Sequence, residues 1–271
     1  MKLSTSAPTT ASESGADELV LSTRDERGVV TLTLNRPRAF NALSESMMAA
    51  LQTGLDAAAL DDSVRVVVLA AAGTAFCAGH DLKEMRAEPS QAYYEHLFAQ
   101  CTKLMMSLQN LPVPVIAKVQ GIATAAGCQL VAMCDLAVAS SDARFAVSGV
   151  NLGLFCSTPS VALSRNLNRK AAFEMLVTGD FISAEQALAK GLVNRVATPD
   201  ALDSAVELLA ASIVAKPRVA VALGKALFYR QLELGTAAAY VDAGHTMACN
   251  MMDTSALEGV QAFIKKRPPR W

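Results

Sequence analysis

The stretch 115–139, VIAKVQGIATAAGCQLVAMCDLAVA, constrains the fold of this chain more than any other. It opens with an apolar run of strand length, which Gly121 interrupts, and small residues at 125–127 then lead into apolar residues at helical spacing. A strand that feeds a helix through a turn with so few side chains leaves the first N–H groups of the helix open to a negatively charged oxygen. The same residues also suit a tight turn that is packed for its own sake.

The composition describes a chain with a large core. It has 271 residues, 52% of them hydrophobic, so one or two domains are expected. A net charge of −1 with scattered Lys and Arg argues against a nucleic-acid partner, and no apolar run reaches the ~18 residues of a membrane span. Six cysteines without a C-x-x-C pair are expected to be reduced thiols, which places the protein in the cytoplasm.

The pattern alternates between strand and helix as far as residue 200 and is mainly helical afterwards. Strands are expected at 19–23, 29–34, 64–70, 115–119, 136–138 and 192–196, with loops at 71–79 and 148–159. Helices are expected at 44–60, 90–108, 161–167, 171–178, 184–190, 200–215, 218–232, 236–251 and 254–265. The sequence therefore predicts a disordered lead at 1–17, an α/β core at 18–200 and a helical oligomerisation region at 201–271.

A second loop of small residues, 76–82, follows a buried strand in the same manner as the central turn. Two such loops that meet would each supply one backbone N–H, from His80 and from Ala126, to the same oxygen. Such a pair of donors is an oxyanion hole, in which each donor contributes about 3–4 kcal/mol in acyl chemistry.

These segments together resemble a known family. The stretches 34–43, 76–82 and 121–135, followed by 176–187 and 191–193, are similar to successive signatures of the crotonase (enoyl-CoA hydratase/isomerase) superfamily. The resemblance covers about residues 18–267. Within the superfamily, 123–130 and 153–159 are most similar to one group of enoyl-CoA hydratase domain-containing proteins.

The resemblance implies an α/β fold, a crotonase-like spiral of ββα turns with a C-terminal helical region, in homotrimers or dimers of trimers. It implies an acyl-CoA thioester as substrate, with coenzyme A as part of that substrate and with no separate cofactor. The carbonyl would accept hydrogen bonds from the N–H groups of His80 and Ala126, which stabilises an enolate of the thioester. The residues it implies for substrate binding are Arg38, Ala39, Ala78, Asp81, Leu82, Gly127, Gln129 and Gly149.

Two of these positions depart from the hydratase pattern. Members that hydrate enoyl-CoA carry glutamates where this chain has Gln129 and Gly149. An amide does not take up a proton at neutral pH, and glycine has no side chain, so efficient hydration is not expected. The simple isomerases of the family rely mainly on the second glutamate.

Other polar residues keep two interpretations. The imidazole of His80 would contact the substrate, or it is a histidine at a helix start. Cys156 and Ser157 are candidate catalytic groups, while Ser157 or Thr158 also suits an N-cap before Pro159. His96 and His245 lack ligand spacing, so no metal site is expected.

Three classes of function follow. The first is an acyl-CoA enzyme without the two glutamates: a decarboxylase, an atypical isomerase or a thioester hydrolase. The second is a non-catalytic acyl-CoA binding protein. A dinucleotide oxidoreductase is excluded, because no G-x-G-x-x-G follows an expected strand. The sequence does not identify the acyl group of the substrate, because the shape of its pocket depends on how residues 85–110 fold over the site.

Overall fold

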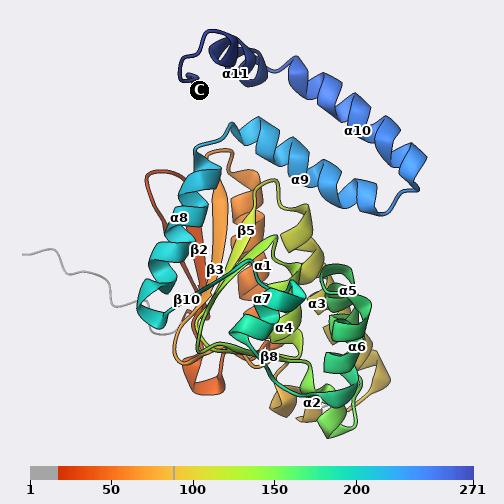
Figure 1. The fold of residues 1–271 in the computed structure, drawn as a ribbon. Coiled ribbons are helices and arrows are strands. Elements are labelled where there is room, and N and C mark those ends of the chain that lie inside the picture. Colours follow the sequence, from red (N-terminus) through yellow and green to blue (C-terminus); the bar gives the residue numbers. More distant parts are fainter. Residues whose placement is uncertain (1–17, 88) are drawn as a thin grey trace, which may run out of the picture.

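The main sheet has six strands and is mostly parallel (Figure 1). In this computed structural model, which describes residues 18–87 and 89–271, the strands lie in the spatial order β1 (Val20–Arg24), β2 (Val29–Leu34), β3 (Val66–Ala71), β5 (Val115–Val119), β7 (Leu136–Ser140) and β10 (Arg195–Ala197). β1 is antiparallel to β2, and all other neighbours are parallel. The predicted lead at 1–17 lies outside the described residues.

A second sheet has four short strands, β4 (Ala75–Cys77), β6 (Ile122–Thr124), β8 (Arg144–Ala146) and β9 (Ile182–Ser183). β4, β6 and β8 each follow a strand of the main sheet and precede a helical segment. This repeat forms the spiral of ββα turns, so the fold class predicted from the sequence is confirmed. The loop expected at 71–79 is wrong in part because it contains β4, and a strand of three residues is too short to show an alternating pattern.

Helix α1 (Glu45–Leu60) covers one face of the main sheet and begins where the sequence predicts. The Met47 N–H donates to the Ser44 hydroxyl at 3.1 Å, which caps the helix. Its apolar face packs into the core through Met47, Met48, Leu51 and Leu55, each at most 1% exposed. The neighbouring helix α3 (Gln91–Asn110) is capped in the same way by Ser90.

Helix α8 (Leu202–Val214) covers the opposite face of the main sheet. Leu202, Val206 and Leu209 pack there against Val66 and Ile116. The side chains of these two strand residues lie on the face of the sheet opposite α1. Because both faces are covered, strands β3 and β5 are apolar almost throughout.

The remaining helices are α2 (Leu82–Ala87), α4 (Ala126–Met133), α5 (Ser157–Asn166), α6 (Arg169–Thr178), α7 (Ala184–Lys190), α9 (Arg218–Leu232), α10 (Thr236–Met251) and α11 (Thr254–Ile264), with short 3-10 helices η2 (Pro37–Ala39), η3 (Ser148–Leu152) and η4 (Pro199–Ala201). The strand expected at 192–196 is shorter than predicted. Leu192 and Val193 are buried in the turn that ends α7 at Gly191, and pairing with β7 begins at Arg195.

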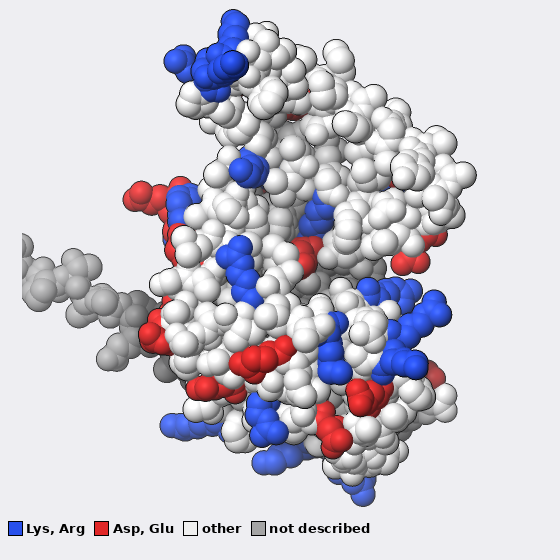
Figure 2. Space-filling view, viewed as in Figure 1, with Lys and Arg blue, Asp and Glu red and all other residues white. Residues whose placement is uncertain are grey.

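Helices α9, α10 and α11 form an arm that extends away from the sheets (Figure 1). Large apolar side chains on this arm are exposed to solvent, among them Phe228, Tyr240, Val241, Met247, Met252 and Phe263. The face of the arm seen in Figure 2 carries few charged side chains apart from Lys and Arg near the C-terminus. Within residues 18–87 and 89–271, no helix has the length and apolar character needed to cross a membrane.

A buried polar cluster fastens the arm to the sheet. The Lys225 ammonium, on α9, donates to the Asp135 carboxylate at 2.6 Å and to two backbone carbonyls. The other carboxylate oxygen accepts from the Tyr229 hydroxyl at 2.7 Å, and the Val115 N–H donates to Asp135 as well. Asp135 therefore ties α9 to the start of β5.

Candidate functional site

A cavity of about 550 Å³ lies between the loops that follow β2, β4 and β6 and the start of α5. It is lined by Arg36, Arg38, Ala39, Phe40, Ala42, Ala78, His80, Asp81, Leu82, Lys83, Met85, Phe98, Ala125, Ala126, Ser148, Gly149, Leu152, Leu154, Phe155, Cys156, Ser157, Thr158 and Pro159. The predicted site residues all line it except Gly127 and Gln129, which lie behind the wall on α4.

Two glycines allow the β4 loop and the start of α4 to touch. A Cβ atom on Gly79 would lie 3.2 Å from the Ala126 nitrogen and 2.9 Å from the Ala125 Cβ. A Cβ atom on Gly127 would lie 2.1 Å from the Cys77 carbonyl oxygen. Such approaches exclude any side chain at either position. The structure thus brings the two loops together, as an oxyanion hole requires.

The two expected donors are free in the described part of the chain. The residues beside His80 pair with Leu43: the Leu43 N–H donates to Gly79, and the Asp81 N–H donates to Leu43. The His80 N–H has no acceptor among residues 18–87 and 89–271, and neither does the Ala126 N–H, which begins α4. Both are therefore open to a ligand oxygen.

Ala125 holds a strained backbone conformation between these loops. Its φ is +51° and its ψ −121°, although it is not a glycine. Its N–H donates to the Ala146 carbonyl at 3.0 Å, which fixes the turn before α4. Strain of this kind costs about 1–3 kcal/mol and occurs often at functional sites.

Asp81 organises the cationic side of the cavity. Its carboxylate pairs with the Arg36 guanidinium at 2.8 Å and accepts from the N–H groups of Lys83 and Glu84, which caps α2. Burial raises the pKa of Asp81, but these hydrogen bonds lower it by more, so the pKa lies below its ordinary value. Asp81 is therefore an ionised structural carboxylate.

Asn41 fixes the loop that presents Arg36 and Phe40 to the cavity. Its side-chain amide donates to the carbonyls of Ala72 and Ala75, each at 2.9 Å, and accepts from the Arg36 N–H. Asn41 is fully buried with a φ of +54°, a conformation that asparagine tolerates better than most residues. Phe40 beside it is 58% exposed.

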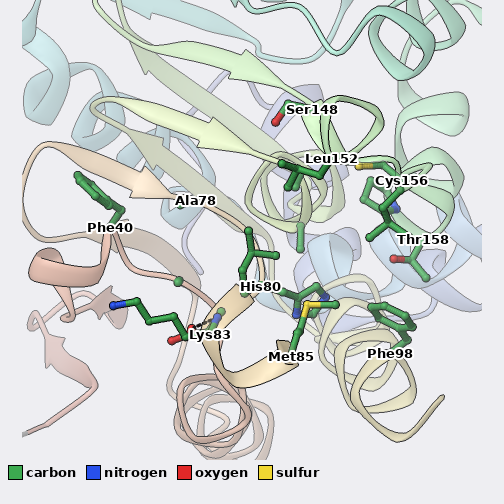
Figure 3. A pocket seen from close by; sticks show the side chains of 18 of the residues that line it. Phe40, Ala78, His80, Lys83, Met85, Phe98, Ser148, Leu152, Cys156 and Thr158 are labelled. Atoms are coloured by element: carbon green, nitrogen blue, oxygen red, sulfur yellow. Dashed lines mark hydrogen bonds between the residues drawn. The ribbon is translucent and has the colours of Figure 1, made fainter. Parts of the chain in front are cut away.

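His80 stands between the cationic side and an apolar side. Figure 3 shows Phe40 and Lys83 on one side of it, and Phe98, Cys156 and Thr158 on the other. Its ring packs edge-on against Phe98 with the centroids 5.6 Å apart. Neither ring nitrogen has a hydrogen-bond partner among the described residues. Burial lowers the pKa of the imidazole, and the Leu43 backbone, which lies near the ring without meeting hydrogen-bond geometry, opposes this shift only in part.

The two positions that depart from the hydratase pattern carry no acid here. Gln129 is 5% exposed, and its Oε1 has no partner among the described residues. A Cβ atom on Gly149 would lie 2.5 Å from the Leu154 carbonyl oxygen and 2.7 Å from the Cys156 Sγ. The wall therefore has no space for a side chain at position 149.

Cys156 and Ser157 lie at the start of α5. The helix begins at Ser157, so Cys156 is the N-cap residue, and its side chain makes no capping hydrogen bond. The predicted cap by Ser157 or Thr158 is wrong, because the helix starts two residues before Pro159. Burial raises the pKa of the Cys156 thiol, while the Gly149 backbone N–H opposes this shift. A thiol with a raised pKa is a poor nucleophile.

Sequence reasoning missed several wall residues, namely Arg36, Phe40, Lys83, Met85, Phe98 and Ser148. Arg36 and Phe40 flank the predicted residues Arg38 and Ala39, so their position in the sequence could have identified them as wall residues. Met85 and Phe98 come from α2 and α3, and no local pattern shows where these helices lie. Within the described ranges, no three His, Cys, Asp or Glu side chains group to hold a metal ion.

The fold and the cavity define a crotonase-type protein. The chain belongs to the enoyl-CoA hydratase/isomerase family, whose sequence profile matches residues 24–271. It is 45% identical to enoyl-CoA hydratase domain-containing protein 3 of Rattus norvegicus over 250 residues, which cover 92% of this chain and 83% of the relative. The family and the group to which the sequence was compared are thereby confirmed.

Solved structures agree with this assignment. The human enoyl-CoA hydratase domain-containing protein 3 superposes with a TM-score of 0.90 at 43% identity, over 93% of this chain and all of that one. An enoyl-CoA hydratase of Mycobacterium smegmatis superposes with a TM-score of 0.93 at 72% identity, over 93% of this chain and 98% of that one.

The predicted cytoplasmic location is contradicted by these comparisons. Enoyl-CoA hydratase domain-containing protein 3 is named as mitochondrial in rat and in Xenopus laevis, which are 45% and 47% identical to this chain. Reduced thiols and a near-neutral charge, on which the prediction was based, do not distinguish the cytoplasm from the mitochondrial interior.

Proposed function

We propose that this protein binds acyl-CoA thioesters and stabilises their enolates. The observation that carries the proposal is the pair of free N–H groups of His80 and Ala126, on loops that Gly79 and Gly127 allow to touch. Donors held in place before the reaction favour an oxygen on which negative charge develops. A relative at 34% identity is named 2,3-dehydroadipyl-CoA hydratase, which supports a thioester as ligand.

The cationic side of the cavity suits the coenzyme A portion. Arg38 and Lys83 are exposed at the cavity, with Arg36 held beside them by Asp81. Phosphate groups pair well with guanidinium and ammonium groups. The exposed ring of Phe40 offers an aromatic surface to the nucleotide base. The acyl chain then points toward Met85 and Phe98.

The reaction is not efficient hydration, because Gln129 and Gly149 replace the two carboxylates that water addition needs. Decarboxylation, isomerisation or thioester hydrolysis remains compatible with an oxyanion hole alone. The same two replacements favour a second candidate, a non-catalytic acyl-CoA binding protein. Either candidate uses the same cavity and the same two donors.

A second copy of this chain is the proposed occupant of the arm's apolar surface, in a trimer or a dimer of trimers. The exposed side chains on α9–α11 support this, since apolar surface of this extent rarely stays in contact with water. Light scattering is the direct test of the assembly, and a monomer at micromolar concentration would contradict it.

The binding proposal is tested by calorimetry with crotonyl-CoA, butyryl-CoA and free coenzyme A. We expect both thioesters to bind more tightly than free coenzyme A, because only they reach the oxyanion hole. No binding at millimolar thioester would contradict the proposal. Incubation with a thioester panel, followed by thioester absorbance and mass spectrometry, then separates an enzyme from a binding protein.

A further inference from the structure

Proton acceptors on the cavity wall are few, which limits the chemistry of the proposed enolate site. Asp81 is the sole carboxylate among the described lining residues, and its oxygens are taken up by Arg36 and by the start of α2. The Cys156 thiol is protonated at neutral pH because burial raises its pKa. An enolate forms only if some group takes the proton from the α-carbon.

The His80 side chain stands next to the proposed position of the thioester carbonyl. The backbone N–H of His80 is one of the two proposed donors, so the side chain of the same residue starts close to the carbonyl oxygen that this N–H would hold. The ring lines the cavity, and Phe98 sets its orientation. Both nitrogens are shielded from water and unpaired in the described part of the chain. A buried polar group without a partner is costly, and because both nitrogens have almost no accessible surface, the ring turns toward the cavity when a bound ligand becomes the missing partner.

We infer that the His80 imidazole is a catalytic residue that removes and returns a proton at the α-carbon of the bound acyl-CoA. This inference rests on the function proposed above and adds the group that moves the proton. His80 then acts twice: its backbone holds the oxygen, and its side chain takes the proton. Burial favours the neutral imidazole, which is the form that accepts a proton.

The step needs no further reactant. The α-carbon–hydrogen bond breaks, its electron pair passes to the thioester oxygen, and the proton goes to a free ring nitrogen of His80. The negative charge on that oxygen is held by the N–H groups of His80 and Ala126. Return of a proton to the α-carbon restores the thioester, and in D₂O a deuteron takes its place.

Deuterium exchange into butyryl-CoA in D₂O tests the inference, with the α-proton signal followed by NMR. We expect exchange with wild-type protein, and a rate about 10²–10⁴-fold lower with His80→Gln, which keeps the backbone donor. Butyryl-CoA affinity by calorimetry should stay within a few-fold. The control is His96→Gln, an exposed histidine on α3, which should exchange at the wild-type rate. Free imidazole should restore exchange to His80→Ala.

The outcomes separate this inference from the function on which it rests. Exchange at the wild-type rate in a folded His80→Gln variant would overturn the inference and leave the enolate function intact, with His80 a packing residue against Phe98. Absence of exchange in wild-type protein that binds butyryl-CoA would also overturn the inference, and would leave a decarboxylase, a thioester hydrolase or an acyl-CoA binding protein. If His80→Gln does not fold, His80→Ala decides, because a packing role predicts no rescue by imidazole.

Discussion

The Sγ atom of Cys156 occupies the space that a side chain at Gly149 would fill. A Cβ atom on Gly149 would lie 2.7 Å from that sulfur and 2.5 Å from the Leu154 carbonyl oxygen. The α5 wall therefore closes over the position from which family hydratases project a carboxylate. The wall is therefore packed so that no glutamate fits at position 149, and the absence of the acid involves Leu154 and Cys156 as well as Gly149.

Substitution at Gly149 should consequently destabilise the protein without creating a hydratase. Gly149→Ala should lower the free energy of unfolding by about 1–3 kcal/mol, because one of the two colliding atoms belongs to the backbone. Gly149→Glu combined with Gln129→Glu should hydrate crotonyl-CoA no faster than wild type. Urea denaturation and thioester absorbance measure the two effects.

A matched glycine serves as control. Gly224 lies in α9, and a Cβ atom added there would meet nothing within 4 Å, so Gly224→Ala should be neutral or stabilising by up to about 1 kcal/mol. A Gly149→Ala variant as stable as wild type would show that the wall yields readily. In that case the packing explanation for the missing acid would fail.

Ala125→Gly should stabilise the protein by a few tenths to about 1 kcal/mol. Glycine adopts the φ of +51° without the steric cost that alanine bears, although it loses more backbone entropy on folding. Ala123→Gly, at a buried strand position nearby, should destabilise instead. Thermal unfolding of both variants makes the comparison, and equal destabilisation would argue against strain at Ala125.

His80 should make the protein less stable in acid. Its pKa in the folded state is lowered from the ordinary value of 6.5, so the unfolded chain binds the proton more readily. The stability that the neutral His80 imidazole contributes to the folded state is fully present above pH 6.5 and is lost as the pH falls toward the folded-state pKa. The drop in melting temperature from pH 7 to pH 5 should be smaller in His80→Gln than in wild type. Equal drops would mean that the imidazole is protonated at no cost.

Lys225→Met should loosen the arm. The substitution leaves the Asp135 carboxylate buried without its cation, and breaking a buried pair in this way costs about 3–5 kcal/mol. Limited proteolysis should then cut between α8 and α9 sooner than in wild type. Lys170→Met, an exposed lysine on α6, is the control and should leave the cleavage rate unchanged. An unaltered rate in Lys225→Met would show that the arm is held by its other contacts.

The sequence was informative where a signal is local. The helix at 44–60 was predicted because its start and its apolar spacing depend on neighbours within a few residues. The short strand β4 was not, since three residues carry no period. The crowding of Gly149 by Leu154 and Cys156 depends on how η3 returns to α5, and neither composition nor spacing contains that information.

The proposed function depends on two backbone N–H groups that hold the thioester carbonyl. Infrared difference spectroscopy of butyryl-CoA labelled with ¹³C at the carbonyl tests it most directly, because hydrogen bonds lower the carbonyl stretching frequency. We expect a lower frequency in the complex than in water. The frequency should return in part when lactic acid replaces Ala126, because this replacement removes that N–H and keeps the side chain. A bound carbonyl that absorbs at or above its frequency in water would show that these two N–H groups do not hold it.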